Sequence, residues 1–208
     1  MAHKVLFLDL NGTVIDDWNP SYAGVRAIFD HYELPCPTLA SFIRGVAHTG
    51  DYHGFYVQNG IDVSRDELYT LYIPAYHAHQ DAIELVPGVH EALERIRNAG
   101  VEIHIVTAAR KDFAEHLIDK ANIAKYCEGF HYHVHDKHSQ IRAIIHGMNV
   151  RPTECAMIGD LPSDVHAANR AGISGIGFMN RHVPPDVFEN VPMKFRCEQF
   201  SELPKFLL

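Results

Sequence analysis

Short apolar runs alternate with amphipathic segments over most of the chain, and this pattern predicts its fold. Residues 5–8 are four consecutive apolar residues that end at polar ones, as a buried strand does. Similar runs predict strands at residues 101–106, about 130–134, 155–158, 173–178 and 194–197, with helices at about 87–98, 112–122, 139–146, 162–171 and 200–208. Strands that alternate with helices of this length predict an α/β fold, a doubly wound parallel sheet covered on both faces.

Residues 16–84 interrupt this alternation. They carry no strong strand run, are rich in aromatic residues and show helical spacing from Tyr22 to Phe29. We expect an all-helical insertion of about four short helices at residues 16–84, within a core domain made of residues 1–15 and 85–208. The expected breaks are Pro35 and Pro37, the glycine-containing stretch 45–60, the capping pair Ser64 and Glu67, and Pro74, which kinks or ends the last helix.

Composition and charge exclude several classes of protein. The 208 residues are 47% apolar and 21% charged, which is ordinary for a soluble globular chain. The formal net charge is −8 and no block of Lys or Arg occurs, so we expect no nucleic-acid partner and no acidic membrane surface. No signal peptide and no apolar span of membrane length is visible. The four cysteines lie far apart without C-x-x-C spacing, which indicates reduced thiols and a cytoplasmic location.

Polar side chains follow three of the predicted strands, at the edge of the sheet where ligands bind in open parallel α/β folds. Carboxylates that converge there repel one another unless a cation neutralises them, and an all-oxygen set of ligands suggests Mg²⁺. A hydroxyl and an ammonium at the same edge suit an anion such as phosphate. For Asp9 and Asn11, which follow the first strand, the alternative is that they only end the strand through turn chemistry. The side chains are Asp9 and Asn11, Thr107, Asp160 with Asp164, and Lys137 just before a predicted helix.

Four short motifs in this order resemble the signature of the haloacid dehalogenase (HAD) superfamily. They are DLNGT at residues 9–13, VTAA at 106–109, Lys137, and GDLPSD at 159–164. The runs PGVHEALERIRNAGVEIHIVTAA and GDLPSDVHAANRAGISGIGF also resemble the core of the family, so the similarity covers the first strand and nearly all of residues 85–180. The resemblance implies a Rossmann-like core, and the helical insertion is similar to the family's C1-type cap.

The resemblance implies a role for each matching position. Asp9 matches the nucleophile that attacks phosphorus and forms an aspartyl-phosphate. Mg²⁺ would be held by the Asp9 carboxylate, the backbone carbonyl of Asn11, and Asp160. Asp164 would support this metal site or orient Lys137; on its own it is also a favourable first-turn helix residue. The expected phosphate-binding groups are Thr107, Ala108 and Lys137, although Thr107 alone is equally compatible with a strand-end hydroxyl that bonds nearby backbone.

The chain departs from the family pattern at residue 11. Phosphatases of the family usually have Asp two positions after the nucleophile, as general acid and then general base. The amide of Asn11 can donate a hydrogen bond but cannot deliver or accept a proton near neutral pH. The loss is worth about 10²- to 10⁴-fold in rate. Three explanations stay open: another proton donor, a slow or non-hydrolysing relative, or a native Asp that was changed.

Other branches of the family fit the sequence less well. Phosphonate-cleaving members and some sugar phosphomutases need a lysine in the cap, and no Lys occurs between Lys4 and Lys111. Dehalogenating members use no Mg²⁺ and have no need of the two carboxylates of GDLPSD.

Two polar groups of residues remain for specificity or for a second metal. A polar cluster in the insertion comprises Arg44, His48, Asp51, Tyr52 and His53. We hypothesise that Arg44 binds substrate charge and that His48 or His53 approaches the leaving group when the cap closes. The alternative is a solvated inter-helix loop. A second group comprises His131, His133, His135 and His138; the first three share one face of an ideal strand, so they fit either a zinc site or a structural strand.

The sequence therefore predicts a cytoplasmic, Mg²⁺-dependent phosphohydrolase of HAD type that acts on a small phosphorylated metabolite. The alternative is a catalytically weakened member that binds phosphate or phosphometabolites or serves as an interaction partner, with Asn11 as the reason. The sequence does not specify the substrate or the oligomeric state.

Overall fold

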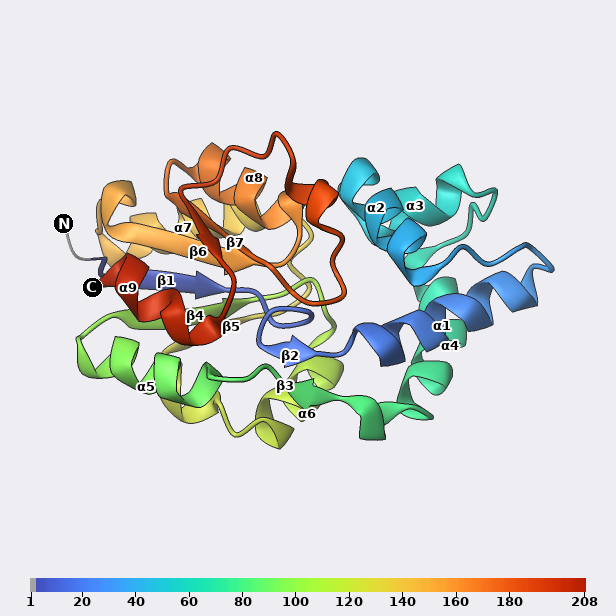
Figure 1. The fold of residues 1–208 in the computed structure, drawn as a ribbon, viewed down its shortest axis with the longest axis horizontal. Coiled ribbons are helices and arrows are strands. Elements are labelled where there is room, and N and C mark those ends of the chain that lie inside the picture. Colours follow the sequence, from blue (N-terminus) through green and yellow to red (C-terminus); the bar gives the residue numbers. More distant parts are fainter. Residues whose placement is uncertain (1–2) are drawn as a thin grey trace.

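One six-stranded sheet forms the centre of the larger part of the molecule (Figure 1). The structure is a computed structural model that describes residues 3–208. All neighbouring strands in this sheet run parallel, and β1 lies between β4 and β6. In sheet order the strands are β5 (Gly129–His131), β4 (Glu102–Val106), β1 (Val5–Leu8), β6 (Cys155–Gly159), β7 (Ser174–Phe178) and β8 (Phe195–Cys197).

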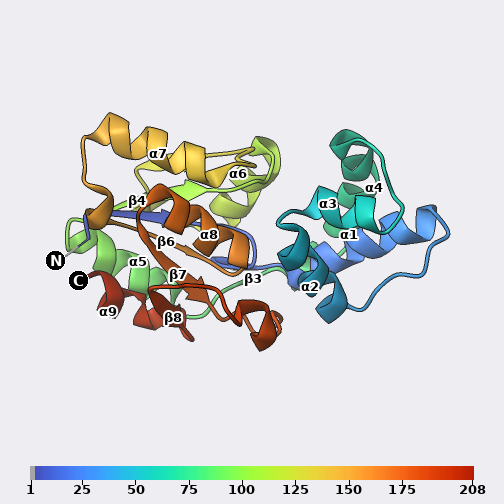
Figure 2. The same cartoon turned by 90° about the horizontal axis from the view of Figure 1, so that it is seen from above.

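Helices cover both faces of the sheet (Figure 2). Because successive side chains of a strand point to opposite faces, Leu6 and Leu8 of β1 pack in one apolar cluster with α5 and α9, and Val5 and Phe7 pack in another with α7 and α8. The predicted α/β, Rossmann-like fold is confirmed. The helices of this part are α5 (Val89–Asn98), α6 (Lys111–Lys120), α7 (Lys137–Met148), α8 (Pro162–Ala171) and α9 (Leu203–Leu207), with 3-10 turns η2 (Ala124–Tyr126), η3 (Pro152–Glu154), η4 (Pro185–Phe188) and η5 (Phe200–Glu202).

One predicted strand is shorter than expected. We expected a strand at about residues 130–134, but β5 ends at His131. His133 has a φ of +58°, in the left-handed region, so the extended backbone stops before it. The His133 amide instead donates to the Ala109 carbonyl at 2.9 Å, and this loop lies against the loop that follows β4.

Four helices follow the first strand and lie together at one end of the molecule (Figures 1 and 2); we call them the cap. The expectation of four short helices agrees with the structure, but the stretch 45–60 is mostly helical rather than a loop. Helix α2 runs through Gly45 and ends at Gly50, whose φ of +80° suits glycine, and α3 begins after Asp51. Pro74 does not end the last helix, which continues to His77. The four helices are α1 (Trp18–His31), α2 (Leu39–Thr49), α3 (Tyr52–Gln58) and α4 (Arg65–His77).

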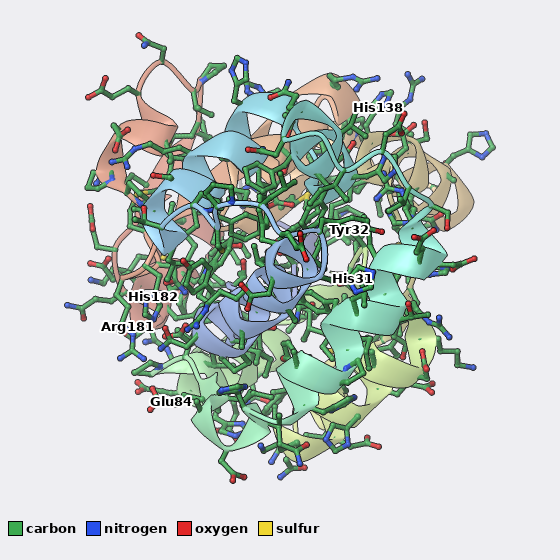
Figure 3. All side chains as sticks on the ribbon, turned by 90° about the vertical axis from the view of Figure 1, so that its right-hand side faces the viewer. His31, Tyr32, Glu84, His138, Arg181 and His182 are labelled. Carbon is green, nitrogen blue, oxygen red and sulfur yellow. The ribbon has the colours of Figure 1, made fainter. Side chains whose placement is uncertain are left out.

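Two short antiparallel strands join the cap to the sheet. β2 (Ile15–Asp16) pairs with β3 (Glu84–Leu85), which follows the 3-10 turn η1 (Gln80–Ala82). Arg181 binds both strands: its Nε lies 2.8 Å from an oxygen of Asp16 and its Nη2 donates to Glu84 at 2.9 Å (Figure 3). The two connections between cap and sheet therefore lie side by side and are held together by one guanidinium.

The cap packs on the edge of the sheet where the parallel strands end. Phe42 and Ile43 of α2 belong to the same apolar cluster as Leu161, Val165 and Phe188. This contact covers the carboxyl ends of the central strands, which is where the polar side chains of the sequence motifs are expected. Within residues 3–208, no helix is long and apolar enough to cross a membrane.

Candidate active site

Three polar residues follow three adjacent strands and end at one edge of the sheet. Asp9 comes just after β1, Thr107 directly after β4 and Asp160 directly after β6. Because β4, β1 and β6 are neighbours and all parallel, these side chains converge. Each is less than one tenth exposed, so the groups face one another rather than bulk water.

Lys137, the first residue of α7, lies between two of the carboxylates. Its Nζ is 2.6 Å from Asp9 Oδ1 and 2.7 Å from Asp164 Oδ1. Burial alone would lower the pKa of Lys137, but the charges of Asp164 and Asp9 outweigh it and raise that pKa above its ordinary value. The amine therefore stays a cation that holds Asp9 in place.

The carboxylates outnumber this cation. One oxygen of each of Asp9, Asp160 and Asp164 lies within 4.8 Å of the others. Burial first, and then the neighbouring Asp164 charge, raise the pKa of Asp9 from 3.8 to about 7 against the opposing effect of Lys137. Burial and the charges of Asp9 and Asp164 also raise the pKa of Asp160 well above its ordinary value. A site in which ionised carboxylates are this costly favours a bound divalent cation, and the all-oxygen donor set fits Mg²⁺.

The loop after β1 brings its backbone against Asp160. Gly12 has a φ of +74°, and a Cβ at this position would overlap the Asp160 carboxylate, so only glycine allows this approach. The Gly12 carbonyl accepts a hydrogen bond from Asn180 Nδ2 at 2.7 Å. The neighbouring carbonyl of Asn11 accepts no hydrogen bond from any residue between 3 and 208, which leaves it available to a metal ion.

Asp160 is itself held by two donors. Its Oδ1 accepts from Thr13 Oγ1 at 3.1 Å and its Oδ2 from the indole Nε1 of Trp18 at 2.9 Å. Trp18 is the first residue of α1, so the cap contributes directly to the position of this carboxylate.

Thr107 and Asp164 each form a local hydrogen bond, and Asp164 also binds Lys137. The Thr107 hydroxyl oxygen accepts from the Ala109 amide at 3.1 Å, which leaves its hydrogen free to donate to a phosphoryl oxygen. Ala108 lies between them in the same half-buried loop. Asp164 accepts from the Leu161 amide at 3.2 Å at the start of α8 while its other oxygen binds Lys137. The local interpretation and the site interpretation are therefore compatible for both residues.

The side chain of Asn11 is tied to the cap connection. Its Nδ2 donates to Asp17 Oδ2 at 2.6 Å. Burial raises the pKa of Asp17, and the hydrogen bonds from Asn11, Tyr76 and Gly12 oppose this rise. Within residues 3–208, the Asn11 amide forms no hydrogen bond with Asp9 or Lys137.

The sequence suggested Arg44, His48 and His53 as cap residues that reach the substrate. Arg44 and His53 instead bond residues outside the aspartate cluster. Arg44 donates through Nε and Nη2 to the two oxygens of Asp186 at 2.7 and 3.0 Å, which joins α2 to η4. His53 bonds the Val63 carbonyl at 2.8 Å within the cap, and His48 lies exposed on α2. The segment is helical at all three residues rather than a loop, but Arg44 and His48 are exposed, as the solvated interpretation expects.

Tyr52, in the cap, lies near the acidic groups of the site. Tyr52 begins α3 and is 37% exposed. Its pKa is raised well above its ordinary value, first by desolvation and then by the nearby Tyr72, Asp160 and Asp17. The ring centroid of Tyr52 lies 5.7 Å from that of Phe42 in α2.

The histidine cluster does not form a three-ligand site. Within residues 3–208, the only group of three or more His, Cys, Asp or Glu side chains close enough to share an ion is the aspartate cluster. His131 instead has Nε2 3.3 Å from Nδ1 of His104, and the turn at His133 takes His133 and His135 away from a common strand face. His138 lies on α7. The zinc hypothesis is therefore not supported.

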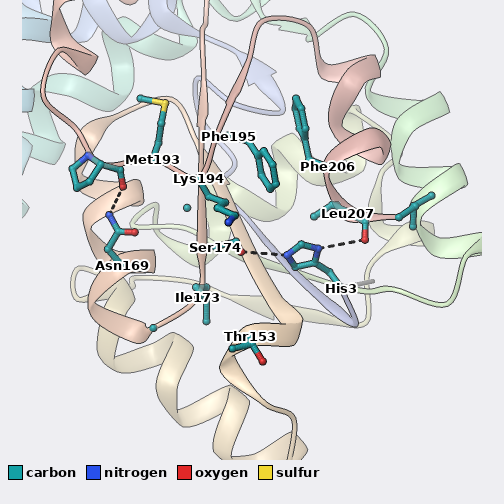
Figure 4. A pocket seen from close by; sticks show the side chains of 14 residues that line it. His3, Thr153, Asn169, Ile173, Ser174, Met193, Lys194, Phe195, Phe206 and Leu207 are labelled. Atoms are coloured by element: carbon teal, nitrogen blue, oxygen red, sulfur yellow. Dashed lines mark hydrogen bonds between the residues drawn. The ribbon is translucent and has the colours of Figure 1, made fainter. Parts of the chain in front are cut away.

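A hollow of about 800 Å³ lies away from these groups (Figure 4). Its lining includes His3, Ser174 and Lys194, and His3 bonds both Ser174 Oγ and the Leu207 carbonyl at 3.3 Å. None of the candidate active-site residues lines it, so volume alone does not mark the chemistry of this molecule.

Comparison with known proteins agrees with the motifs. The family model for haloacid dehalogenase-like hydrolases matches residues 5–178, most of the chain. The chain belongs to this family. It is 24% identical over 193 residues to a phosphoglycolate phosphatase from Pseudomonas putida, covering 84% of this chain and 68% of that protein. It is 25% identical over 181 residues to pyrophosphatase PpaX from Bacillus velezensis, covering 83% and 81%.

Solved structures of a hydrolase and of a predicted phosphatase share the fold. A hydrolase from Pseudomonas syringae matches with a TM-score of 0.82 at 19% identity, covering 99% of this chain and 98% of that one. A predicted phosphoglycolate phosphatase from Haemophilus somnus matches with a TM-score of 0.78 at 15% identity, covering 99% and 98%. At these identities the similarity shows the fold alone.

Four residues at the HAD site were not found from the sequence. Trp18, Asp17 and Tyr76 reach it from the cap and its connection, and Asn180 from the loop after β7. Each of these residues reaches the site through a side-chain hydrogen bond to a residue that is far away in the sequence or lies across a turn. The one available signal in the sequence was the pair Asp16 and Asp17, directly before α1. A helix start needs only one capping carboxylate, so the second indicates another role.

Proposed function

We propose that this chain is a Mg²⁺-dependent phosphatase that hydrolyses a small phosphorylated metabolite through an aspartyl-phosphate on Asp9. The observation that carries the proposal is the Asp9 carboxylate held at 2.6 Å by Lys137 beside Asp160 and Asp164. A phosphatase needs a nucleophile with one oxygen fixed and cationic charge for the phosphoryl oxygens. These groups provide the nucleophile and part of that charge.

The first chemical step is attack by Asp9 on phosphorus. One carboxylate oxygen forms the new P–O bond while the bond to the leaving oxygen breaks; because Asn11 cannot supply a proton, the leaving oxygen takes one from water and departs as the alcohol. Lys137 and the free Thr107 hydroxyl hydrogen would bind the phosphoryl oxygens, together with the Ala108 amide. Mg²⁺, when bound by Asp9, the Asn11 carbonyl and Asp160, supplies further positive charge.

The second step is attack by water on the aspartyl-phosphate, which releases inorganic phosphate and regenerates the Asp9 carboxylate. Asp164 would keep Lys137 oriented through both steps, since it binds the amine at 2.7 Å. The cap, residues 16–84 on the core of residues 1–15 and 85–208, would cover the site during turnover. A covered site favours a small substrate over a phosphoprotein. The four free cysteines support a reducing, cytoplasmic location.

The names of the relatives suggest which substrates to test first. They include phosphoglycolate and pyrophosphate, the substrates named for the two relatives above. A phosphate-release screen would use these two compounds, a panel of sugar phosphates and a generic aryl phosphate, each with Mg²⁺ and with a chelator. The proposal predicts release that needs Mg²⁺ and disappears in Asp9→Ala. Release that persists in Asp9→Ala would contradict it.

The alternative is a weakened family member that binds phosphate compounds without appreciable turnover. The observation that favours it is Asn11, whose amide is engaged with Asp17 and cannot transfer a proton. Substrate binding with no release in the unmodified chain would support this alternative.

A further inference from the structure

Asp17 occupies the N-cap position of α1 but does not cap the helix. An aspartate here would ordinarily accept a hydrogen bond from an amide of the first turn, and no such side-chain bond is formed. Its carboxylate instead turns toward the loop after β1, where Oδ2 accepts from Asn11 Nδ2 at 2.6 Å and Oδ1 from the Gly12 amide at 3.1 Å. Asp17 is only 2% exposed.

Donors from the cap complete the surroundings of this carboxylate. The hydroxyl of Tyr76, in α4, donates to Asp17 Oδ2 at 2.9 Å, and the hydroxyl of Ser21, in α1, lies 3.4 Å from the same oxygen. Tyr76 is 1% exposed and packs against Phe113 of α6. The Asp17 carboxylate therefore joins the active-site loop to two cap helices through buried hydrogen bonds.

We propose that Asn11 and Asp17 are a matched donor–acceptor pair, in which Asp17 is a positioning residue that fixes side chain 11 and, through Tyr76, links it to the cap. The proposal rests on the proposed function, because position 11 follows the nucleophile by two residues. It changes how Asn11 is interpreted: the residue suited to position 11 depends on the residue at position 17.

Charge complementarity is the physical basis of the pair. A carboxylate introduced at position 11 would face the Asp17 carboxylate at a hydrogen-bond distance, where burial keeps water from screening their repulsion. An amide introduced at position 17 would lose the acceptor charge that now receives several donors. Exchanging the two residues restores one donor and one acceptor.

The test compares four chains: the unmodified protein, Asn11→Asp, Asp17→Asn, and the exchange Asn11→Asp with Asp17→Asn. Turnover of an aryl phosphate with Mg²⁺ is measured as separate kcat and KM values. We expect kcat of the exchange chain to exceed that of either single variant by about tenfold or more, because pairing is restored and a carboxylate stands at position 11. Asn11→Asp alone with a kcat equal to or above that of the exchange chain would overturn the proposal.

Thermal unfolding of the same four chains gives a readout that needs no activity. We expect Asn11→Asp to lower the unfolding midpoint by about 5 °C and the exchange to recover most of this loss. Independent effects that simply add would overturn the pairing. Turnover that does not depend on Asp9 would instead contradict the proposed function. The unfolding midpoints would still show whether residues 11 and 17 are paired.

A matched tyrosine pair tests the link to the cap. Tyr76→Phe removes the hydroxyl that donates to Asp17. Tyr32→Phe removes an exposed tyrosine–carboxylate bond of 2.8 Å, between the residue after α1 and Glu67 of α4. Trp18 is the single tryptophan and bonds Asp160, so its fluorescence reports on the cap connection. We expect Tyr76→Phe to change this fluorescence and lower kcat about fivefold at nearly constant KM, with Tyr32→Phe unchanged in both. Equal behaviour of the two variants would contradict the positioning role.

Discussion

The strand-end edge of the core and the facing surface of the cap hold polar residues in different ways. In the core, Asp9, Thr107 and Asp160 converge because each follows a strand of one parallel sheet. In the cap, Arg44 and His53 form hydrogen bonds to Asp186 and to the Val63 carbonyl rather than to the carboxylates of the site. The register of the sheet therefore fixes where the residues at its edge lie. On a cap helix, the type of a residue alone does not show whether that residue belongs to the site.

The largest expected effect belongs to the core edge. Asp9→Asn keeps the size of the side chain but removes the nucleophilic oxygen charge, so turnover should fall by about 10⁴-fold or more. The measurement is phosphate release with Mg²⁺ on the best substrate of the screen. Asp119→Asn, on the exposed side of α6, is the control and should keep full turnover. A loss of turnover of less than about tenfold in Asp9→Asn would contradict the expectation that the core edge, rather than the cap, carries the chemistry.

Metal binding should also depend on the core edge. Asp160→Asn removes a charged ligand, and the apparent affinity for Mg²⁺ should fall about 10²-fold. Fluorescence of Trp18 measures this directly, because its indole donates to Asp160 at 2.9 Å. Ca²⁺ and K⁺ titrations of the same samples separate a specific site from a general effect of salt. A Mg²⁺ titration that is identical in both chains would show that Asp160 is no ligand.

The pH dependence of stability separates the buried core edge from the rest of the protein. Burial, the largest cause, raises the pKa of Asp9 from 3.8 to about 7, so between these values the folded protein binds a proton that the unfolded chain has lost. The contribution of Asp9 to the free energy of unfolding is therefore full below about pH 4 and is lost as the pH rises through 7.

We expect the unfolding midpoint of the metal-free protein to fall by about 5 °C relative to Asp9→Asn between pH 5 and pH 8, and Mg²⁺ to reverse the fall. Differential scanning calorimetry of both chains checks this difference. A gap between the midpoints that stays constant with pH, or that moves the other way, would mean that Asp9 is not strained by burial.

The smallest effects are expected from the cap candidates. Arg44 and Asp186 are each about half exposed, so Arg44→Ala should change kcat and KM by less than about threefold. Tyr52→Phe should raise KM about threefold to tenfold, because it removes one hydroxyl near the acidic residues of the site. Steady-state kinetics of both variants measures the contrast. A larger loss in Arg44→Ala than in Tyr52→Phe would reverse the assignment of cap residues.

Much of the fold and the core edge followed from the sequence. The apolar runs that became β1, β4, β6 and β7 were found because a buried parallel strand is a nearly continuous apolar run. The expected neighbourhood of Asp9, Asp160 and Lys137 followed from the motif order, and their side chains lie together in the structure.

Other features depend on contacts that no local pattern encodes. β5 stops at His131 because His133 adopts a positive φ, and this conformation breaks the alternation on which the zinc hypothesis rested. The bonds of Asp17 to Asn11 and to Tyr76 span 6 and 59 residues. Arg44 meets Asp186 only because the cap packs on η4. These contacts arise when two separately folded surfaces meet.

The most direct test of the account is identification of the phosphorylated residue. Enzyme mixed with Mg²⁺ and substrate would be quenched in acid within milliseconds, digested, and analysed by mass spectrometry. We predict one phosphoryl group on the peptide that contains Asp9, absent from Asp9→Asn treated in the same way. Phosphate on a histidine peptide, or turnover without any phosphorylated peptide, would contradict the assignment of Asp9 as nucleophile.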